Sequence, residues 1–196
     1  MRFVIIVLSL LLTSVWTFSA DESIAGIYNP GELKPTDSEL RVSLGQEAPD
    51  FELPSVDGKR VRLSDYRDKQ HVIISFVPAA WTPVCSAQWP GYNLMEEDFA
   101  DLGAVVVGIT VDNIPTLHAW EEAMEGIAFP VLSDFFPHGE VAKQFGILRS
   151  DGTTERALFI VDKQGIIRFI DVHDINIRPP MEDLFNALEQ INKTVK

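Results

Sequence analysis

The most constraining feature of this sequence is a short apolar run that stops at a proline and leads into a helical pattern. Residues 72–77 read Val-Ile-Ile-Ser-Phe-Val, which is typical of a buried β-strand, and Pro78 ends the run. A helical pattern begins close to Cys85, the only cysteine of the chain. We therefore expect a strand that feeds a helix, with the cysteine near the helix N-terminus, where unpaired N–H groups and the helix dipole stabilise a thiolate.

The other segments predict a mixed α/β domain. Apolar, β-branched runs predict further strands at residues 104–111, 129–132, 157–161 and 166–172. Apolar stripes predict further helices after Asp112 or Asn113, at residues 140–145 with Gly146 as the stop, and from residue 180 to about residue 195. Two hairpins are expected, one with an Asp57-Gly58 turn and one with its turn at residues 162–165. This order favours a central mixed sheet covered by helices on both faces.

The helix that begins near Cys85 contains a proline. Its pattern continues to about Leu102, and Pro90 lies inside it. A proline in a helix interior removes one backbone hydrogen bond, so we expect a kink or a break near Trp89.

The first forty residues differ in character from the rest. Residues 1–20 contain Arg2, an apolar run at 3–12 and then small and polar residues, which is typical of a secretory signal peptide cleaved after Ala20 or Ala25. The alternative is an uncleaved membrane anchor, although the apolar stretch is shorter than the ~20 residues that a span needs. We expect an exported protein, periplasmic or extracellular, and a membrane-anchored one if the leader is retained. A loose arm is expected at residues 21–40 and the folded domain at residues 41–196.

Charge and cysteine count narrow the function classes. The formal net charge is −13, which argues against nucleic acid and anionic membrane surfaces as partners. A single cysteine excludes a disulfide within the chain. In an exported protein, one cysteine suggests either pairing between chains or a reactive thiol.

Three motifs carry a resemblance to a known family. Pro78, Thr82 and Cys85 match the Pro-x-x-x-Thr-x-x-Cys motif of peroxiredoxins, the thiol peroxidases of the alkyl hydroperoxide reductase/thiol-specific antioxidant group. Residues 155–162 resemble the strand that brings the family's active-site arginine, here Arg156, under the thiolate. Residues 45–54 are similar to the family's usual opening, so the resemblance covers roughly residues 42–188.

The resemblance implies a thioredoxin-like fold and a peroxidase that reduces hydrogen peroxide or organic hydroperoxides. Cys85 would be the nucleophile, oxidised to a sulfenic acid that an external thiol or a thioredoxin-like reductant recycles, because no second cysteine is present. The Thr82 hydroxyl, the Arg156 guanidinium and the backbone N–H of Val84 would be donors to the peroxide oxygens, and Pro78 would shield the thiolate from water. A homodimer stays open, and no metal or other cofactor is implied.

Other interpretations of the same residues stand beside this one. Cys85 could be a buried core residue of a non-enzymatic, exported thioredoxin-fold module that binds a partner. Arg156 could be a surface cation beside Glu155. Trp81 lies near the cysteine in sequence and could favour an organic hydroperoxide or serve as a core or interface aromatic. Asp171, His173 and Asp174 form the best metal-like cluster, for which solvated loop residues are the better interpretation. The sequence contains no phosphate-binding loop or nucleotide fingerprint.

Overall fold

The computed structural model describes residues 24–194, so the leader expected at residues 1–20 lies outside the described part. Seven strands are present there: β1 (Glu52–Pro54), β2 (Arg60–Arg62), β3 (His71–Phe76), β4 (Ala104–Thr110), β5 (Val131–Ser133), β6 (Arg156–Val161) and β7 (Ile167–His173). The helices are α1 (Pro83–Asn93), α2 (Glu96–Asp101), α3 (Ile114–Ala123), α4 (Glu140–Phe145) and α5 (Met181–Thr194), with a 3-10 turn η1 (Leu63–Tyr66). Both hairpins, β1–β2 and β6–β7, form where the sequence predicts them.

Five strands make the central mixed sheet, in the order β5-β4-β3-β6-β7. β3 is its middle strand, parallel to β4 and antiparallel to β6. All six residues of β3 and all six of β6 are buried, which explains their nearly continuous apolar sequence. The run that ends at Pro78 therefore lies at the centre of the molecule.

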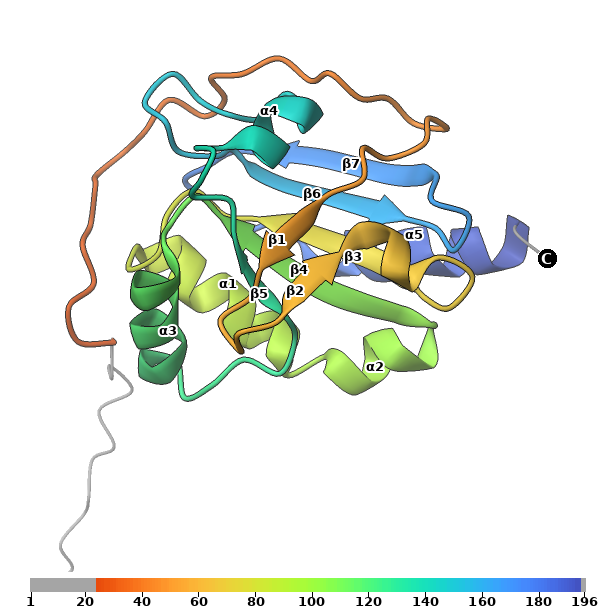
Figure 1. The fold of residues 1–196 in the computed structure, drawn as a ribbon, viewed down its shortest axis with the longest axis horizontal. Helices are drawn as coiled ribbons and strands as arrows, with labels where there is room; N and C mark the ends of the chain where they lie inside the picture. Colours follow the sequence, from red (N-terminus) through yellow and green to blue (C-terminus); the bar gives the residue numbers. More distant parts are fainter. Residues whose placement is uncertain (1–23, 195–196) are drawn as a thin grey trace, which may run out of the picture.

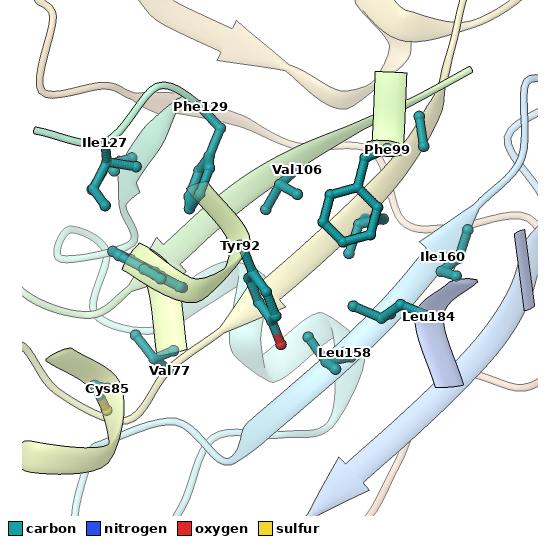
Figure 2. Close-up of a cluster of buried hydrophobic side chains, with 14 of the residues drawn as sticks. Val77, Cys85, Tyr92, Phe99, Val106, Ile127, Phe129, Leu158, Ile160 and Leu184 are labelled. Atoms are coloured by element: carbon teal, nitrogen blue, oxygen red, sulfur yellow. The ribbon is translucent and has the colours of Figure 1, made fainter. Parts of the chain in front are cut away.

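Side chains alternate between the two faces of this sheet. On the first face Ile73, Leu158 and Ile160 pack against α1, α3 and α5 in one hydrophobic cluster. Cys85 lies at one end of this cluster beside Val77, and Phe99 and Ile160 lie toward the other end (Figure 2). The first face thus carries the cysteine-bearing helix.

A second cluster fills the opposite face. Phe76, Phe145 and Phe159 form its aromatic centre, with ring centroids 4.8 to 6.1 Å apart. Here α4, η1 and the β1–β2 hairpin supply the cover (Figure 1). The sheet is therefore covered on both faces, as predicted, and a hairpin shares the second face with the helix.

The helix after Cys85 departs from its predicted course. It begins at Pro83 and continues through Pro90 to Asn93, so the break falls after Pro90, near Leu94 and Met95, and not at Trp89. The missing N–H of Pro90 leaves the helix intact because Trp89 before it and Tyr92 after it are both buried in the core. Tertiary packing here outweighs the local effect of the proline.

Residues 24–40 contain no helix or strand, but they lie against the domain, whereas the sequence predicted a loose arm. We call residues 24–40 the arm. Figure 1 shows the arm running along the outside of the domain, past α4 and past the side where β3 leads to α1. Within the described residues, no helix is long and apolar enough to cross a membrane.

Candidate active site

Cys85 is the third residue of α1, and its side chain is fully buried. Thr82 occupies the N-cap position, but its hydroxyl makes no capping bond and donates instead to the carbonyl oxygen of Ala79 at 3.0 Å. The first intrahelical bond runs from the Ser86 N–H to the Thr82 carbonyl at 2.9 Å. Helix geometry leaves the N–H groups of Val84 and Cys85 without an intrahelical acceptor, so they stay available to a negative charge.

Arg156 starts β6 and reaches Cys85 from beneath. Its Nη2 lies 3.5 Å from the Cys85 sulfur, Nε and Nη2 donate to the Ile175 carbonyl at 3.2 and 3.0 Å, and Nη1 donates to Gln88 Oε1 at 2.5 Å. The residue is only 1% exposed. Glu155, the expected neighbour, turns to the other face of the strand and pairs with Arg149 at 2.6 Å.

The charge of Arg156 has no carboxylate partner within residues 24–194. A buried cation is costly unless an opposite charge or several hydrogen bonds compensate it. The bonds that it makes are to a carbonyl, an amide oxygen and the sulfur of Cys85. The position of a counter-charge is therefore occupied by the thiol sulfur.

A buried polar network connects α1 to the sheet behind the cysteine. Gln88 Nε2 donates to the Tyr92 hydroxyl at 3.1 Å and to Ser75 Oγ at 3.3 Å, and Trp89 Nε1 also donates to Ser75 Oγ, at 3.1 Å. Burial raises the pKa of Tyr92, so this phenol stays neutral. The network fixes the rotamer of Gln88 and, through it, the direction of the guanidinium of Arg156.

Gln88 was not singled out from the sequence. It lies three residues after Cys85 on the same helix, and residues at that spacing share a helix face. The spacing from Cys85 was the only sequence signal that Gln88 belongs to the site. Its role became clear once the structure placed the Arg156 guanidinium against its side-chain oxygen. Ile175 gave no signal, because it acts through its backbone carbonyl.

The loop between β3 and α1 is held in an unusual conformation. Trp81 has a left-handed backbone with φ of 60°, which is unfavourable for a residue with a bulky side chain. The Ala80 N–H donates to the Asp112 carboxylate at 2.8 Å, which ties the loop to the end of β4. This tie places Thr82 and the first turn of α1 over Arg156.

A cavity of about 500 Å³ lies over these groups. Four predicted site residues line it: Pro78, Thr82, Val84 and Arg156. Cys85 lies just beneath this lining, since its sulfur contacts Arg156 while its own surface is fully covered. The ring of Trp81 packs against the first hydrophobic cluster and near Gly26, and it is not among the lining residues.

The metal-like cluster has ordinary polar partners. His173 Nδ1 lies 3.1 Å from an Asp171 carboxylate oxygen, and Asp174 accepts from the backbone and side chain of Asn176. Within the described residues, no group of three or more His, Cys, Asp or Glu side chains is arranged to hold a metal ion.

Known proteins resemble this chain in sequence and in fold. The AhpC/TSA family model matches residues 44–170. Alkyl hydroperoxide reductase E of Mycobacterium tuberculosis is 33% identical over 132 residues, covering 67% of this chain and 86% of that protein. Peroxiredoxin-2 of Cricetulus griseus is 34% identical over 161 residues, covering 77% of this chain and 80% of that protein.

Solved structures give the same result. The reduced 2-Cys peroxiredoxin of Plasmodium vivax superposes with a TM-score of 0.71 at 25% identity, covering 76% of this chain and 82% of that one. The peroxidoxin BcpB of Mycobacterium tuberculosis superposes with a TM-score of 0.66 at 27% identity, covering 78% and 98%. A thioredoxin-like sheet with this motif order defines a thiol-dependent peroxidase. The chain belongs to the AhpC/TSA family and is a peroxiredoxin.

Proposed function

We propose that this peroxiredoxin reduces peroxides through a Cys85 sulfenic acid that an external thiol recycles. The observation that carries the proposal is the buried Arg156 guanidinium, 3.5 Å from the Cys85 sulfur and without a carboxylate partner among the described residues. Two adjacent groups can stabilise the negative charge that develops in the reaction: the cation, and the unsatisfied N–H groups at the start of α1. A merely structural cysteine would need neither.

In the proposed reaction the thiolate sulfur attacks the terminal oxygen of the hydroperoxide in line with the O–O bond. The S–O bond forms as the O–O bond breaks, and the bonding electron pair leaves with the second oxygen, which takes up a proton to become water or an alcohol. The sulfur is oxidised by two electrons and the peroxide is reduced by two. Arg156 and the N–H groups of Val84 and Cys85 supply donors for the charge that develops on the oxygens.

Thr82 and Pro78 have supporting roles in the same step. The Thr82 hydroxyl, which donates to Ala79 in this structure, can turn toward a peroxide oxygen in the cavity that it lines. Pro78 offers no N–H and covers the site with an apolar ring, which limits water near the thiolate.

Recycling needs two equivalents of an external thiol, because Cys85 is the chain's only cysteine. The first thiol displaces water from the sulfenic acid to give a mixed disulfide, and the second releases Cys85 as a thiol and leaves as the external disulfide. A thioredoxin-like reductant or a small thiol fits this role. Because Cys85 is fully buried, we expect the first turn of α1 to loosen before the external thiol can reach it.

The test is to treat the reduced protein with one equivalent of hydrogen peroxide in the presence of dimedone and to locate the adduct by mass spectrometry. We expect the adduct on Cys85 and no peroxide consumption by Cys85→Ser, which removes the nucleophile with little change in volume. A Cys85–Cys85 dimer without a trapped sulfenic acid would instead mean that resolution occurs between chains. Peroxide consumption by the serine variant would contradict the proposal.

We also propose that the protein works outside the cytoplasm. The support is the sequence of residues 1–20, with one early cation and an apolar run followed by small residues. Mass spectrometry of the exported fraction should give a start near Asp21 or Gly26. A full-length chain in membranes would indicate an anchor, and a full-length chain in the cytosol would contradict export.

A further inference from the structure

The arm supplies a large part of the wall of the cavity over the candidate active site. Residues 28–33 contribute six of the seventeen residues that line it. Residues 78–84 other than Trp81 supply six more, and Arg156 also lines the cavity. A segment outside the part matched by the family model therefore shapes the cavity that Arg156 lines, and Cys85 lies beside Arg156.

Both ends of this wall are fixed to the site itself. The Tyr28 N–H donates to the Trp81 carbonyl at 2.8 Å, directly before Thr82. At the other end, the Leu33 N–H donates to Asn176 Oδ1 and the Leu33 carbonyl accepts from Asn176 Nδ2, both at 2.8 Å. Asn176 follows Ile175, whose carbonyl holds Arg156. The arm is thus bonded to the two loops that carry the groups around Cys85.

Further along, the arm is anchored on charged residues built into the domain. Lys34 offers its carbonyl to Arg149 Nη2 at 2.9 Å, and the Asp37 N–H donates to Glu155 Oε1 at 2.5 Å. Arg149 and Glu155 are buried, 6% and 0% exposed, and pair with each other at 2.6 Å. The arm supplies part of the hydrogen bonding that these buried charges need. The position of the arm is therefore fixed by the domain.

Asp37 completes the anchor. Its carboxylate accepts from the Ser150 N–H at 3.0 Å and from Ser150 Oγ at 2.5 Å, and it pairs with Lys34 at 2.6 Å. These hydrogen bonds, the one from Lys34 foremost, hold the pKa of Asp37 well below its usual range. The carboxylate is therefore ionised at all pH values at which the enzyme would work.

The chemistry of the cavity limits what can occupy it. Proline, leucine, isoleucine and alanine side chains make up much of the lining, which suits an apolar group. Two carboxylates, Glu32 and Asp151, also line it, and Arg156 is the one cation among the described lining residues. Since Arg156 is bonded to Gln88, Ile175 and Cys85, a carboxylate on the substrate tail would meet mainly negative charge.

We propose that residues 28–33 form a specificity wall that holds the tail of an uncharged organic hydroperoxide while its –OOH group reaches Cys85. This inference depends on the proposed function of Cys85, and the chemical step is the same: sulfur takes the terminal oxygen, and the tail leaves as its alcohol. Hydrogen peroxide has no tail and gains nothing from the wall. Selectivity between the two peroxides is therefore the property that the arm controls.

The first experiment changes side chains of the wall. Second-order rate constants for Cys85 oxidation are measured by rapid quenching, alkylation and mass spectrometry, with hydrogen peroxide and with cumene hydroperoxide. Tyr28→Ala and Leu33→Ala should each lower the rate with cumene hydroperoxide about 3- to 10-fold, as expected for a lost apolar contact, and should leave the rate with hydrogen peroxide within about twofold. Leu40→Ala, an arm residue that does not line the cavity, is the matched control and should change neither rate.

The second experiment tests charge. Glu32→Gln should raise the oxidation rate with the hydroperoxide of linoleic acid severalfold and leave the rate with its methyl ester unchanged. Glu39→Gln, on the arm but outside the cavity, should alter neither rate.

A third experiment cuts the anchor of the arm. Asp37→Ala should lower the rate with cumene hydroperoxide as much as Tyr28→Ala does, and amide hydrogen exchange at Leu33 should become faster.

The outcomes separate the two proposals. If the wall variants change both peroxide rates in parallel, or change neither, the specificity wall is wrong although Cys85 remains the nucleophile. If the unmodified protein and Leu40→Ala fail to react with any peroxide, the proposed function itself fails.

Discussion

The two faces of the central sheet are built from the same strands, yet they differ in what their side chains do. On the second face, Phe76 and Phe159 meet Phe145 in a cluster of apolar contacts. On the first face, the same strands present Ser75 and Arg156, which bond to α1. Both faces bury apolar side chains, and the first face in addition holds a polar network at the end nearest Cys85.

The comparison shows how the register of β6 keeps the buried Arg156 guanidinium on the first face. In β6, Arg156 alternates with Ala157, so a change of one residue in register would place the guanidinium among the phenylalanines. The register of six buried residues fixes that choice. Packing on the second face thus fixes the position of Arg156 on the first. We expect variants on the second face to change mainly stability and variants near Cys85 to change mainly activity.

The largest expected effect is on the apolar face. Phe159→Ala removes a ring whose centroid lies 4.8 Å from that of Phe145, and it should lower the free energy of unfolding by about 3–5 kcal/mol. The rate of Cys85 oxidation in the fraction that stays folded should not change. Urea unfolding measures the first quantity and rapid quenching the second. Phe136→Ala, at a side chain that is 87% exposed, is the control and should change neither.

On the polar face, Arg156→Ala should slow Cys85 oxidation by roughly 10- to 1000-fold, because a donor to the transition state and the cation beside the sulfur are lost together. Thr82→Val should act in the same direction within the same range. Arg168→Ala removes a half-exposed cation from the neighbouring strand and serves as the control. Unchanged oxidation in Arg156→Ala would place the reactivity of Cys85 elsewhere.

A substitution at Gly108 should change both stability and oxidation rate. A Cβ on this residue would lie 2.7 Å from the indole ring of Trp89, and the indole N–H bonds Ser75. Gly108→Ala should therefore lower the free energy of unfolding by about 1–3 kcal/mol and also slow oxidation. Gly91→Ala, where the added carbon would lie 3.7 Å from Met181, should keep full activity. A destabilised Gly108→Ala with an unchanged oxidation rate would show that the network behind Cys85 is not needed.

The smallest expected effect concerns His71, a buried polar residue on the same face but bonded to Asn192 of α5. Burial is the main cause that lowers the pKa of His71, and Lys163 acts in the same direction. The unfolded chain then binds the proton more readily, so this contribution to stability is complete above pH ~6.5 and is lost as the pH falls toward the lowered folded value. Urea unfolding from pH 7.5 to 5 should show a shallower loss in His71→Asn. An identical pH dependence would contradict the assignment.

Much of this architecture was predictable because it follows local rules. The apolar runs located the central strands, Asn113 caps α3 by accepting from the Thr116 N–H, and Gly146 ends α4 in a left-handed conformation. Cys85 and Arg156 were found through sequence motifs. These features depend on the residues themselves or on their near neighbours.

What escaped the sequence depends on partners distant in the chain. Pro90 does not break α1, because Trp89 bonds to Ser75 of β3 and Tyr92 is buried in the first hydrophobic cluster. The arm lacks periodicity, and its attachment depends on Glu155 and Arg149, more than a hundred residues away. Polar and proline-rich composition describes such a segment in isolation and carries no information about the buried charges that fix it.

The surroundings of the tryptophans have an optical consequence. Trp120 donates to Ser86 at 2.9 Å, next to Cys85, so adding an oxygen to the sulfur should alter the fluorescence of that indole. Trp81 instead accepts the Tyr28 N–H at its carbonyl and packs near Gly26, so its emission should follow detachment of the arm. The ring centroid of Trp89 lies 5.0 Å from that of Trp120, so both indoles report on the end of α1 near Cys85. Replacing Trp81 with phenylalanine would therefore remove the signal of the arm and leave the signal of the chemistry. The protein thus carries separate intrinsic probes for its chemistry and for the closure of its cavity.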